Sequence, residues 1–190
     1  MKNKILILMA MLGFLFCLGT ARVYALTINP STLYVLATDE NSDSVIQTLI
    51  DPYLAGSDLL YKQEVGLPEE GTLASSYKTT FSNTTSDPSN ALIEYEGGAI
   101  VDPIAYLLVK DGNQKEYPDW YSFYFYNLTA LGWNGMETIS IENFWTSQGA
   151  ISHVSLYGTS TPVPEPATML LLGSGLVGLA TFGRRKFKKN

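Results

Sequence analysis

Hydrophobic and polar residues alternate over short runs in most of the chain, and polar turn sequences separate these runs. Alternation with a period of two is typical of a β-strand that buries one face. The dipeptides Asp111-Gly112 and Asn134-Gly135 are typical of tight turns between strands. Residues 45–50 fit either a strand or a short helix. Strands are predicted over residues 32–38, 59–65, 73–81, 91–95, 104–110, 120–127, 136–141 and 150–157.

This succession of short strands, without a long helix, predicts an all-β fold. We expect an antiparallel β-sandwich, jelly-roll-like, over residues 26–160. The segment holds four lysines and no arginine against 17 acidic residues, a formal charge of −13. A domain this acidic repels phosphate backbones, so binding to nucleic acid is not expected. The segment has no cysteine, which excludes a disulfide or a thiolate nucleophile.

The first 25 residues have the pattern of a secretory signal peptide. Two lysines precede an apolar run over residues 5–18, and a small-residue site ends at Ala25. We expect export through the Sec translocon and cleavage by signal peptidase between Ala25 and Leu26. Cys17, the one cysteine of the chain, would leave with this peptide.

The last 30 residues, 161–190, divide into three segments of different character. The first is the tetrapeptide Val163, Pro164, Glu165 and Pro166, which its prolines hold in an extended conformation. Residues 167–183 are uncharged and apolar, at the short end of what spans a hydrocarbon core of about 30 Å as a transmembrane helix. A basic tail over 184–190 follows, with Arg184, Arg185, Lys186, Lys188 and Lys189. The positive-inside rule keeps this tail in the cytoplasm and the preceding domain outside.

This arrangement resembles the PEP-CTERM sorting signal of exported proteins of Gram-negative bacteria. In that family exosortase, an integral-membrane cysteine protease-transpeptidase, cuts near the motif and passes the protein toward the cell surface or extracellular polymer. The resemblance implies an exosortase substrate: an inner-membrane-anchored precursor that becomes a surface or extracellular-matrix protein and associates with exopolysaccharide. Residues 111–158 are also similar to the closing hairpins of exported PEP-CTERM proteins, which end in a Gly-Ala-Ile-Ser-His-like strand.

Catalysis is not expected. His153 is the only histidine, so it is the only candidate base for a Ser/His/Asp hydrolase, and it cannot build a multi-histidine zinc site. No Gly-x-Ser-x-Gly sequence supplies a nucleophile on a strained turn. We interpret His153 as a sheet residue bonded to its neighbours, and the protein as not an enzyme.

Two ligand sites remain open. Asp39, Asn41 and Asp43 have the alternate spacing of oxygen ligands in a calcium loop. An EF-hand is rejected because its sixth position is Ser44 and its twelfth is Ile50, so only a looser loop site for calcium is considered. The competing interpretation is a solvated acidic turn.

The second candidate site is a glycan-binding face on the predicted strand 120–127. Alternation places Trp120, Tyr124 and Tyr126 on the face opposite Phe123 and Phe125. If the phenylalanines face the core, the other face offers aromatic rings for stacking on sugars. A covering loop or a second sheet would bury both faces instead.

The sequence therefore favours an exported, exosortase-processed protein with a structural or adhesive role. The alternative is a carbohydrate- or calcium-binding β-sandwich module associated with exopolysaccharide.

Overall fold

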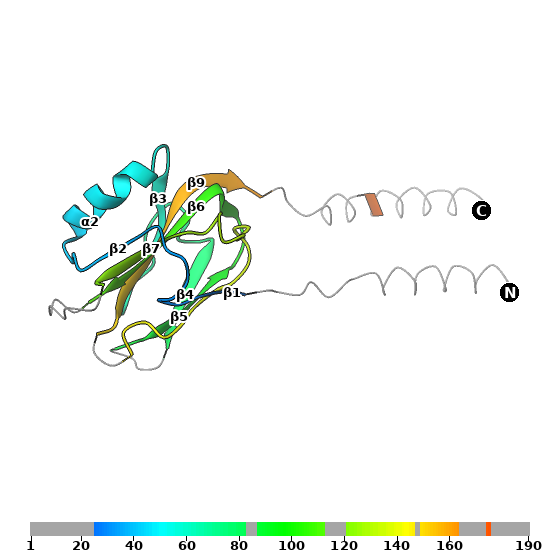
Figure 1. Cartoon of the computed structure of the whole chain (residues 1–190). Helices are drawn as coiled ribbons and strands as arrows, with labels where there is room; N and C mark the ends of the chain where they lie inside the picture. Colours follow the sequence, from blue (N-terminus) through cyan, green and yellow to red (C-terminus); the bar gives the residue numbers. More distant parts are fainter. Residues whose placement is uncertain (1–24, 83–86, 113–120, 147–148, 164–173, 176–190) are drawn as a thin grey trace, which may run out of the picture.

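The computed structural model describes residues 25–82, 87–112, 121–146, 149–163 and 174–175. Its strands form two sheets, one with four strands and one with five (Figure 1). The four-stranded sheet has the spatial order β1 (Leu26–Ile28), β8 (Ile139–Ile141), β5 (Asn90–Tyr95) and β4 (Tyr77–Ser82). The five-stranded sheet has the order β2 (Leu36–Thr38), β7 (Phe123–Asn127), β6 (Ala99–Asp111), β9 (Ile151–Pro162) and β3 (Asp58–Glu64).

The all-β prediction is confirmed, with one correction to the strand directions. Within the described residues every strand pairing is antiparallel except β1 with β8, which run parallel from Leu26↔Ile139 to Ile28↔Ile141. The expected antiparallel arrangement therefore does not hold for this one pair. Strand β1 is three residues long and was not predicted, because so short a run carries no detectable alternation.

One hydrophobic core contains side chains from both sheets. Ile28 and Ile139 of the four-stranded sheet belong to the same buried cluster as Leu107 of β6 and Val154 of β9, and all four side chains are fully buried. Burial of this shared apolar surface is the main force that holds the two sheets in place.

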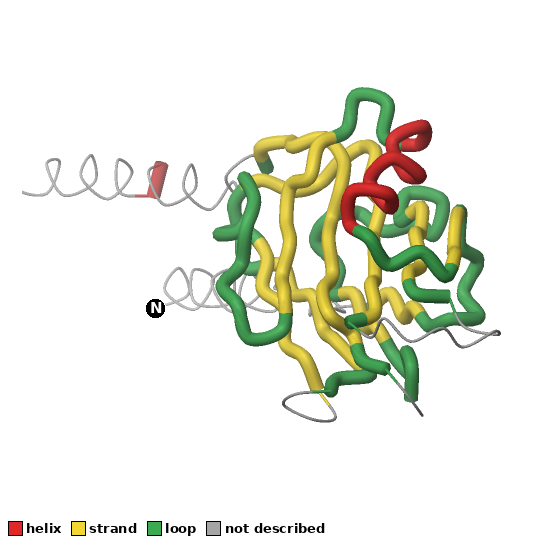
Figure 2. The backbone as a smooth tube through the Cα atoms, turned by 90° about the vertical axis from the view of Figure 1, so that its left-hand side faces the viewer, coloured by secondary structure: helices red, strands yellow, loops and turns green. Residues whose placement is uncertain are grey.

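A helix covers the other face of the five-stranded sheet. Helix α2 (Asp43–Ile50) is followed by the 3₁₀ turn η1 (Asp51–Tyr53). The helix lies beside the strands of this sheet (Figure 2). Ile46 and Ile50, four residues apart, lie on one face of α2 and pack with Phe123, Phe125 and other residues of the sheet. The segment 45–50, open between strand and helix in the sequence, is thus helical.

The predicted strand limits differ from the observed ones both at the sheet edges and in the centre of the five-stranded sheet. Only residues 36–38 of the predicted strand 32–38 form a strand, β2. The strand predicted over 73–81 begins only at Tyr77, as β4. Strands β6 and β9 are longer than predicted, because they pair with each other over ten register positions and continue to Ala99↔Pro162.

Within the described residues, no helix is long and apolar enough to cross a membrane. The predicted helix over 167–183 lies outside these residues apart from Ser174 and Gly175, so it remains a prediction. The signal peptide before Ala25, residues Pro164, Glu165 and Pro166, and the basic tail also lie outside them.

Candidate functional site

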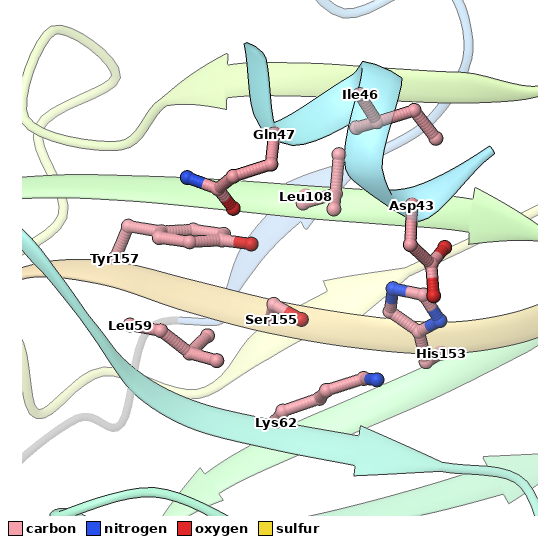
Figure 3. Close-up of a pocket in the computed structure, with 9 residues that line it drawn as sticks. All are labelled: Asp43, Ile46, Gln47, Leu59, Lys62, Leu108, His153, Ser155 and Tyr157. Atoms are coloured by element: carbon pink, nitrogen blue, oxygen red, sulfur yellow. The ribbon is translucent and has the colours of Figure 1, made fainter. Parts of the chain in front are cut away.

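A pocket of about 150 Å³ lies between helix α2 and strand β3, on the face of the five-stranded sheet that α2 partly covers. Four elements contribute side chains: Figure 3 shows that Asp43 and Gln47 extend from α2, Leu59 and Lys62 lie on β3, and β9 forms the floor beside β6. The floor residues are His153, Ser155 and Tyr157, with Ile46 and Leu108 completing the lining.

The strand register explains why these side chains meet. His153 lies directly opposite Glu64 on β3 and Lys110 on β6. Two residues further along β9, Ser155 lies between Lys62 and Leu108 in the same way. Directly opposed residues of an antiparallel pair share a face, so the register gathers His153, Ser155 and both lysines on one face.

Two ion pairs balance the charge around the pocket. The Nζ atom of Lys110 lies 3.2 Å from Oδ1 of Asp43, and Lys62 pairs with Glu64. The Lys110 side chain is only 10% exposed, whereas that of Asp43 is 67% exposed. Asp43 therefore neutralises a largely buried cation from the first turn of α2, where the helix dipole also favours a carboxylate.

His153 is uncharged at neutral pH in this environment. Its side chain is buried, and that burial lowers its pKa from 6.5 to about 4, assisted by the positive charges of Lys62 and Lys110. Asp43 and Glu64 act in the opposite direction but more weakly. A base of such low pKa accepts protons poorly at neutral pH, which gives no support to a catalytic role.

Two hydroxyl groups lie in the middle of the pocket. Burial raises the pKa of Tyr157 to about 12, and the nearby Ser155 hydroxyl lowers it to a smaller extent. Ser155 is 1% exposed, and its Oγ atom has no hydrogen-bond partner among the described residues. The two hydroxyls are thus neighbours that do not reach hydrogen-bonding geometry. A buried hydroxyl without a partner costs free energy, and a bound polar group would relieve this cost.

The predicted glycan-binding face is corrected by the structure. Tyr126 is fully buried in the core between the sheets, and its hydroxyl donates a hydrogen bond of 3.1 Å to the carbonyl oxygen of Asn29. Tyr124 is half-buried and packs edge-on against Phe144 and Tyr34. Trp120 lies outside the described residues. The structure therefore excludes Tyr126 from an open aromatic face, because this side chain lies in the core shared with the second sheet. For Trp120 and the half-buried Tyr124 the glycan-binding face stays a prediction.

The predicted calcium loop is held by internal contacts. The Glu40 carboxylate accepts hydrogen bonds from the backbone N–H groups of Asn41 and Ser42 at 2.9 and 2.8 Å. Asp43 begins helix α2 and pairs with Lys110. No group of three or more His, Cys, Asp or Glu side chains arranged to hold a metal occurs in the part of the chain that the structure describes. Asp39 therefore stays a candidate calcium ligand, but no group of three such side chains is assembled around it among the described residues.

The pocket could be foreseen only in part from the sequence. Alternation along 150–157 does place His153, Ser155 and Tyr157 on one face. Two of the four lysines in the domain, Lys62 and Lys110, fall in predicted strands, and charged residues within strands could have pointed to a polar site on the sheet. Their convergence was missed because the pairing of β3 and β6 with β9 is not encoded in any local pattern.

The C-terminal motif begins where the folded domain ends. Strand β9 remains paired with β6 to Pro162, and Val163 is the next residue. The hydroxyls of Thr159 and Thr161 donate hydrogen bonds of 2.7 and 2.8 Å to the carbonyl oxygen of Asp102. These contacts fix the last residues before the motif to the sheet.

Comparison with known proteins identifies this C-terminal segment. Residues 162–186 match the family model described as the PEP-CTERM protein-sorting motif. The resemblance predicted from the sequence is thereby confirmed, and the motif supports an exported protein that exosortase processes. No curated protein and no solved structure matches the chain at a significant level.

Proposed function

We propose that this protein is a surface or extracellular-matrix component of a Gram-negative bacterium, with a structural or adhesive role and without enzymatic activity. The observation that carries the proposal is the sorting motif at residues 162–186, joined directly to the end of strand β9. In this proposal the Sec translocon and signal peptidase deliver the domain, and residues 167–183 anchor it in the inner membrane until exosortase acts.

The working part after processing is the two-sheet domain, which we propose to be a β-sandwich. Its shared core and its formal charge of −13 over residues 26–160 suit a stable, soluble module outside the cell. The non-enzymatic role is supported by the low pKa of His153, since this is the only imidazole in the chain. Association with exopolysaccharide is part of the proposed role.

The intact mass of the protein recovered from the host's surface fraction and medium tests the proposal. We expect a chain that begins at Leu26 and ends near Pro164, with or without an added group at the cut end. Replacing Glu165 by Ala, or the cluster Arg184, Arg185 and Lys186 by Ala, should leave the full tail on the protein and retain it in the membrane fraction. A matched Glu137→Ala change, in a loop of the domain, should be processed normally.

Recovery of wild-type protein that still carries residues 167–190 would overturn the proposal. The protein would then be permanently anchored by its tail.

A further inference from the structure

We propose that the pocket between α2 and β3 binds one neutral sugar residue, with Ser155 and Lys62 as hydrogen-bonding groups. This inference rests on the adhesive role proposed above and names the ligand class through which the domain would adhere. It involves none of the strand 120–127 tyrosines considered from the sequence.

The charge balance of the pocket favours an uncharged ligand. Lys62 pairs with Glu64 and Lys110 with Asp43, so two cations and two anions surround the neutral His153. An entering anion would meet the exposed carboxylate of Asp43 at the rim, and an entering cation would meet the two lysines. A hydroxyl group avoids both penalties, because it can donate to a carboxylate and accept from an ammonium group.

The polar groups of the pocket match a ligand that carries several hydroxyls. The Ser155 hydroxyl is buried without a partner, and Figure 3 places it between His153 and Tyr157, with the Lys62 side chain extending toward the His153 end. Gln47 donates its amide N–H to Asp51 at 2.7 Å, which orients the amide group near Tyr157. The pocket therefore offers both donors and acceptors, and each hydroxyl of a sugar ring can use either kind.

The apolar part of the pocket suits the C–H face of a sugar ring. The ring of Tyr157 lies at one end, next to Leu59 of β3. Aromatic rings commonly supply apolar contact together with a polar group. The volume of about 150 Å³ is below the range of about 300–1,000 Å³ typical of drug-sized ligands, so the pocket admits one ring rather than an oligomer.

The rim of the pocket is exposed to solvent, and the floor lies at its bottom, largely covered by the surrounding side chains. Leu59 is 41% exposed and the Asp43 side chain 67%, whereas Ser155 and His153 are buried. A terminal residue or a side branch of a glycan can therefore enter from the rim. The remainder of the glycan would stay in solvent.

His153 provides a direct measurement, because it is the only histidine in the chain and it lines this pocket. We would titrate the untagged, isotope-labelled full-length protein, in a detergent without sugar groups, and follow the imidazole signals by NMR. The probes are the methyl glycosides of glucose, galactose, mannose and N-acetylglucosamine. Sodium acetate and inorganic phosphate, at matched ionic strength, serve as anionic comparisons.

We expect saturable movement of the His153 signals with at least one glycoside and none with the anions. Saturation by acetate or phosphate instead would overturn the neutral-ligand assignment and make this an anion site. Absence of saturable movement with every probe would overturn the proposal as a whole.

Variants locate the binding in the pocket. Leu59→Trp should fill the mouth and raise the dissociation constant at least about tenfold, equivalent to 1.4 kcal/mol. Leu67→Trp is the matched control, since Leu67 is an exposed leucine (52%) outside the pocket lining, and it should bind as the parent does. Ser155→Ala should weaken binding without filling the pocket. Unchanged binding in both Leu59→Trp and Ser155→Ala would place the ligand elsewhere and overturn the proposal.

These results are separable from the test of processing. If the mass shows normal processing but no glycoside binds, the proposed sorting stands and only the proposed sugar site is overturned. If a glycoside binds but the protein keeps its full tail, the proposed processing is overturned and the sugar site stands.

Discussion

His153 makes the stability of the domain sensitive to mild acid. Its pKa is about 4 in the folded protein and 6.5 when exposed, so the unfolded chain binds more protons between these two values. The free energy of unfolding should therefore fall as the pH drops from about 6.5 to 4, by about 3 kcal/mol in all from this residue. Urea unfolding at a series of pH values measures the slope.

The His153→Gln variant is the control, because its side chain is neutral throughout this range. It should lose the slope between pH 6.5 and 4 but keep a further loss below about pH 4.5. That lower loss includes Glu64, whose pKa is lowered by its hydrogen bond from Lys62, so its contribution disappears as the carboxylate is protonated. An identical slope in both proteins would contradict the assignment to His153.

Tyr77 should be the tyrosine hydroxyl on which stability depends most clearly. It donates to the carbonyl oxygen of Gly135 at 2.8 Å and accepts from the N–H group of Val101 at 3.0 Å, in a buried position. Tyr77→Phe leaves both backbone groups without this partner, so we expect a loss of about 2–4 kcal/mol in the free energy of unfolding.

Tyr95→Phe provides the comparison for Tyr77. The Tyr95 hydroxyl donates to the carbonyl oxygen of Gly98 at 2.7 Å near solvent, where water replaces the lost bond. This variant should change stability by less than about 0.5 kcal/mol. If the two substitutions lower the free energy of unfolding equally in denaturant unfolding, the buried hydrogen bonds of Tyr77 contribute no more to stability than the exposed bond of Tyr95.

Residue-level patterns predicted faces but not their surroundings. Alternation correctly separated Phe123 and Phe125 from Tyr124 and Tyr126. Both sets are nevertheless largely buried, because α2 covers one face and the four-stranded sheet the other. Which element lies over a strand depends on contacts between residues far apart in the sequence, and no period-two pattern contains that information.

At the level of elements, the end of β9 connects the fold to its processing. Residues Ser160 to Pro162 pair with Ala99 to Val101 of β6, beyond Gly158, the last residue of β9 that pairs with β3. We call this two-stranded extension the terminal ribbon. A protease needs its substrate in an extended form that is free to enter the active site. A cut near Pro164 therefore requires one of two things. Either the terminal ribbon opens, or the enzyme reaches the residues just after Pro162 while the ribbon stays paired.

A disulfide across the terminal ribbon tests whether it opens. Ile100 and Thr161 are directly opposed, at a separation that antiparallel partners and disulfides share, about 4.5–6 Å between Cα atoms. The pair Ile100→Cys with Thr161→Cys should slow removal of the tail under oxidising conditions, and reductant should restore it. Pulse-chase measurement of the precursor and product masses gives the rates.

The matched control is the pair Thr80→Cys with Leu92→Cys. These residues are directly opposed on β4 and β5, in the other sheet. This disulfide should leave the processing rate unchanged. Equal rates for the two cross-linked proteins would mean that the terminal ribbon stays closed while the enzyme acts.

The elements themselves were predictable where they are long and central. Residues 104–110 and 150–157 lie within β6 and β9, which pair with each other in the middle of the five-stranded sheet. Two of the four edge strands differ most from the prediction: β1 has no predicted counterpart, and β2 is shorter than the predicted strand 32–38. An edge strand has a neighbour on only one side, so its limits depend on that neighbour and less on its own residues. The helix α2 was ambiguous because Ile46 and Ile50 fit a helix face as well as a strand face.

At the scale of the whole molecule, the sequence predicted the C-terminal sorting signal, which the family model confirms at residues 162–186, whereas the signal peptide over residues 1–25 stays a prediction. The sequence did not predict what the domain between these two segments does. The sorting signal is readable because prolines, an uncharged run and a basic tail act through local chemistry and order along the chain. The pocket at His153 arises from four elements, α2, β3, β6 and β9, which bring together residues 43–47, 59–64, 108–110 and 153–157. Such a site forms only when the chain folds. The sequence therefore shows the residues that line the pocket but does not show that they come together.

The high negative charge of the domain makes a final prediction about cations. Seventeen acidic residues against four lysines repel one another, so divalent cations should stabilise the folded protein by reducing this repulsion. Because Glu40 and Asp43 are engaged by their own chain, we expect Ca²⁺ and Mg²⁺ at equal concentration to raise Tm equally. Thermal unfolding of the parent and of Asp39→Asn should give the same increment for both ions. A rise specific to Ca²⁺ that disappears in Asp39→Asn would instead establish the calcium loop of Asp39, Asn41 and Asp43, since Mg²⁺ fits such flexible oxygen sites less well.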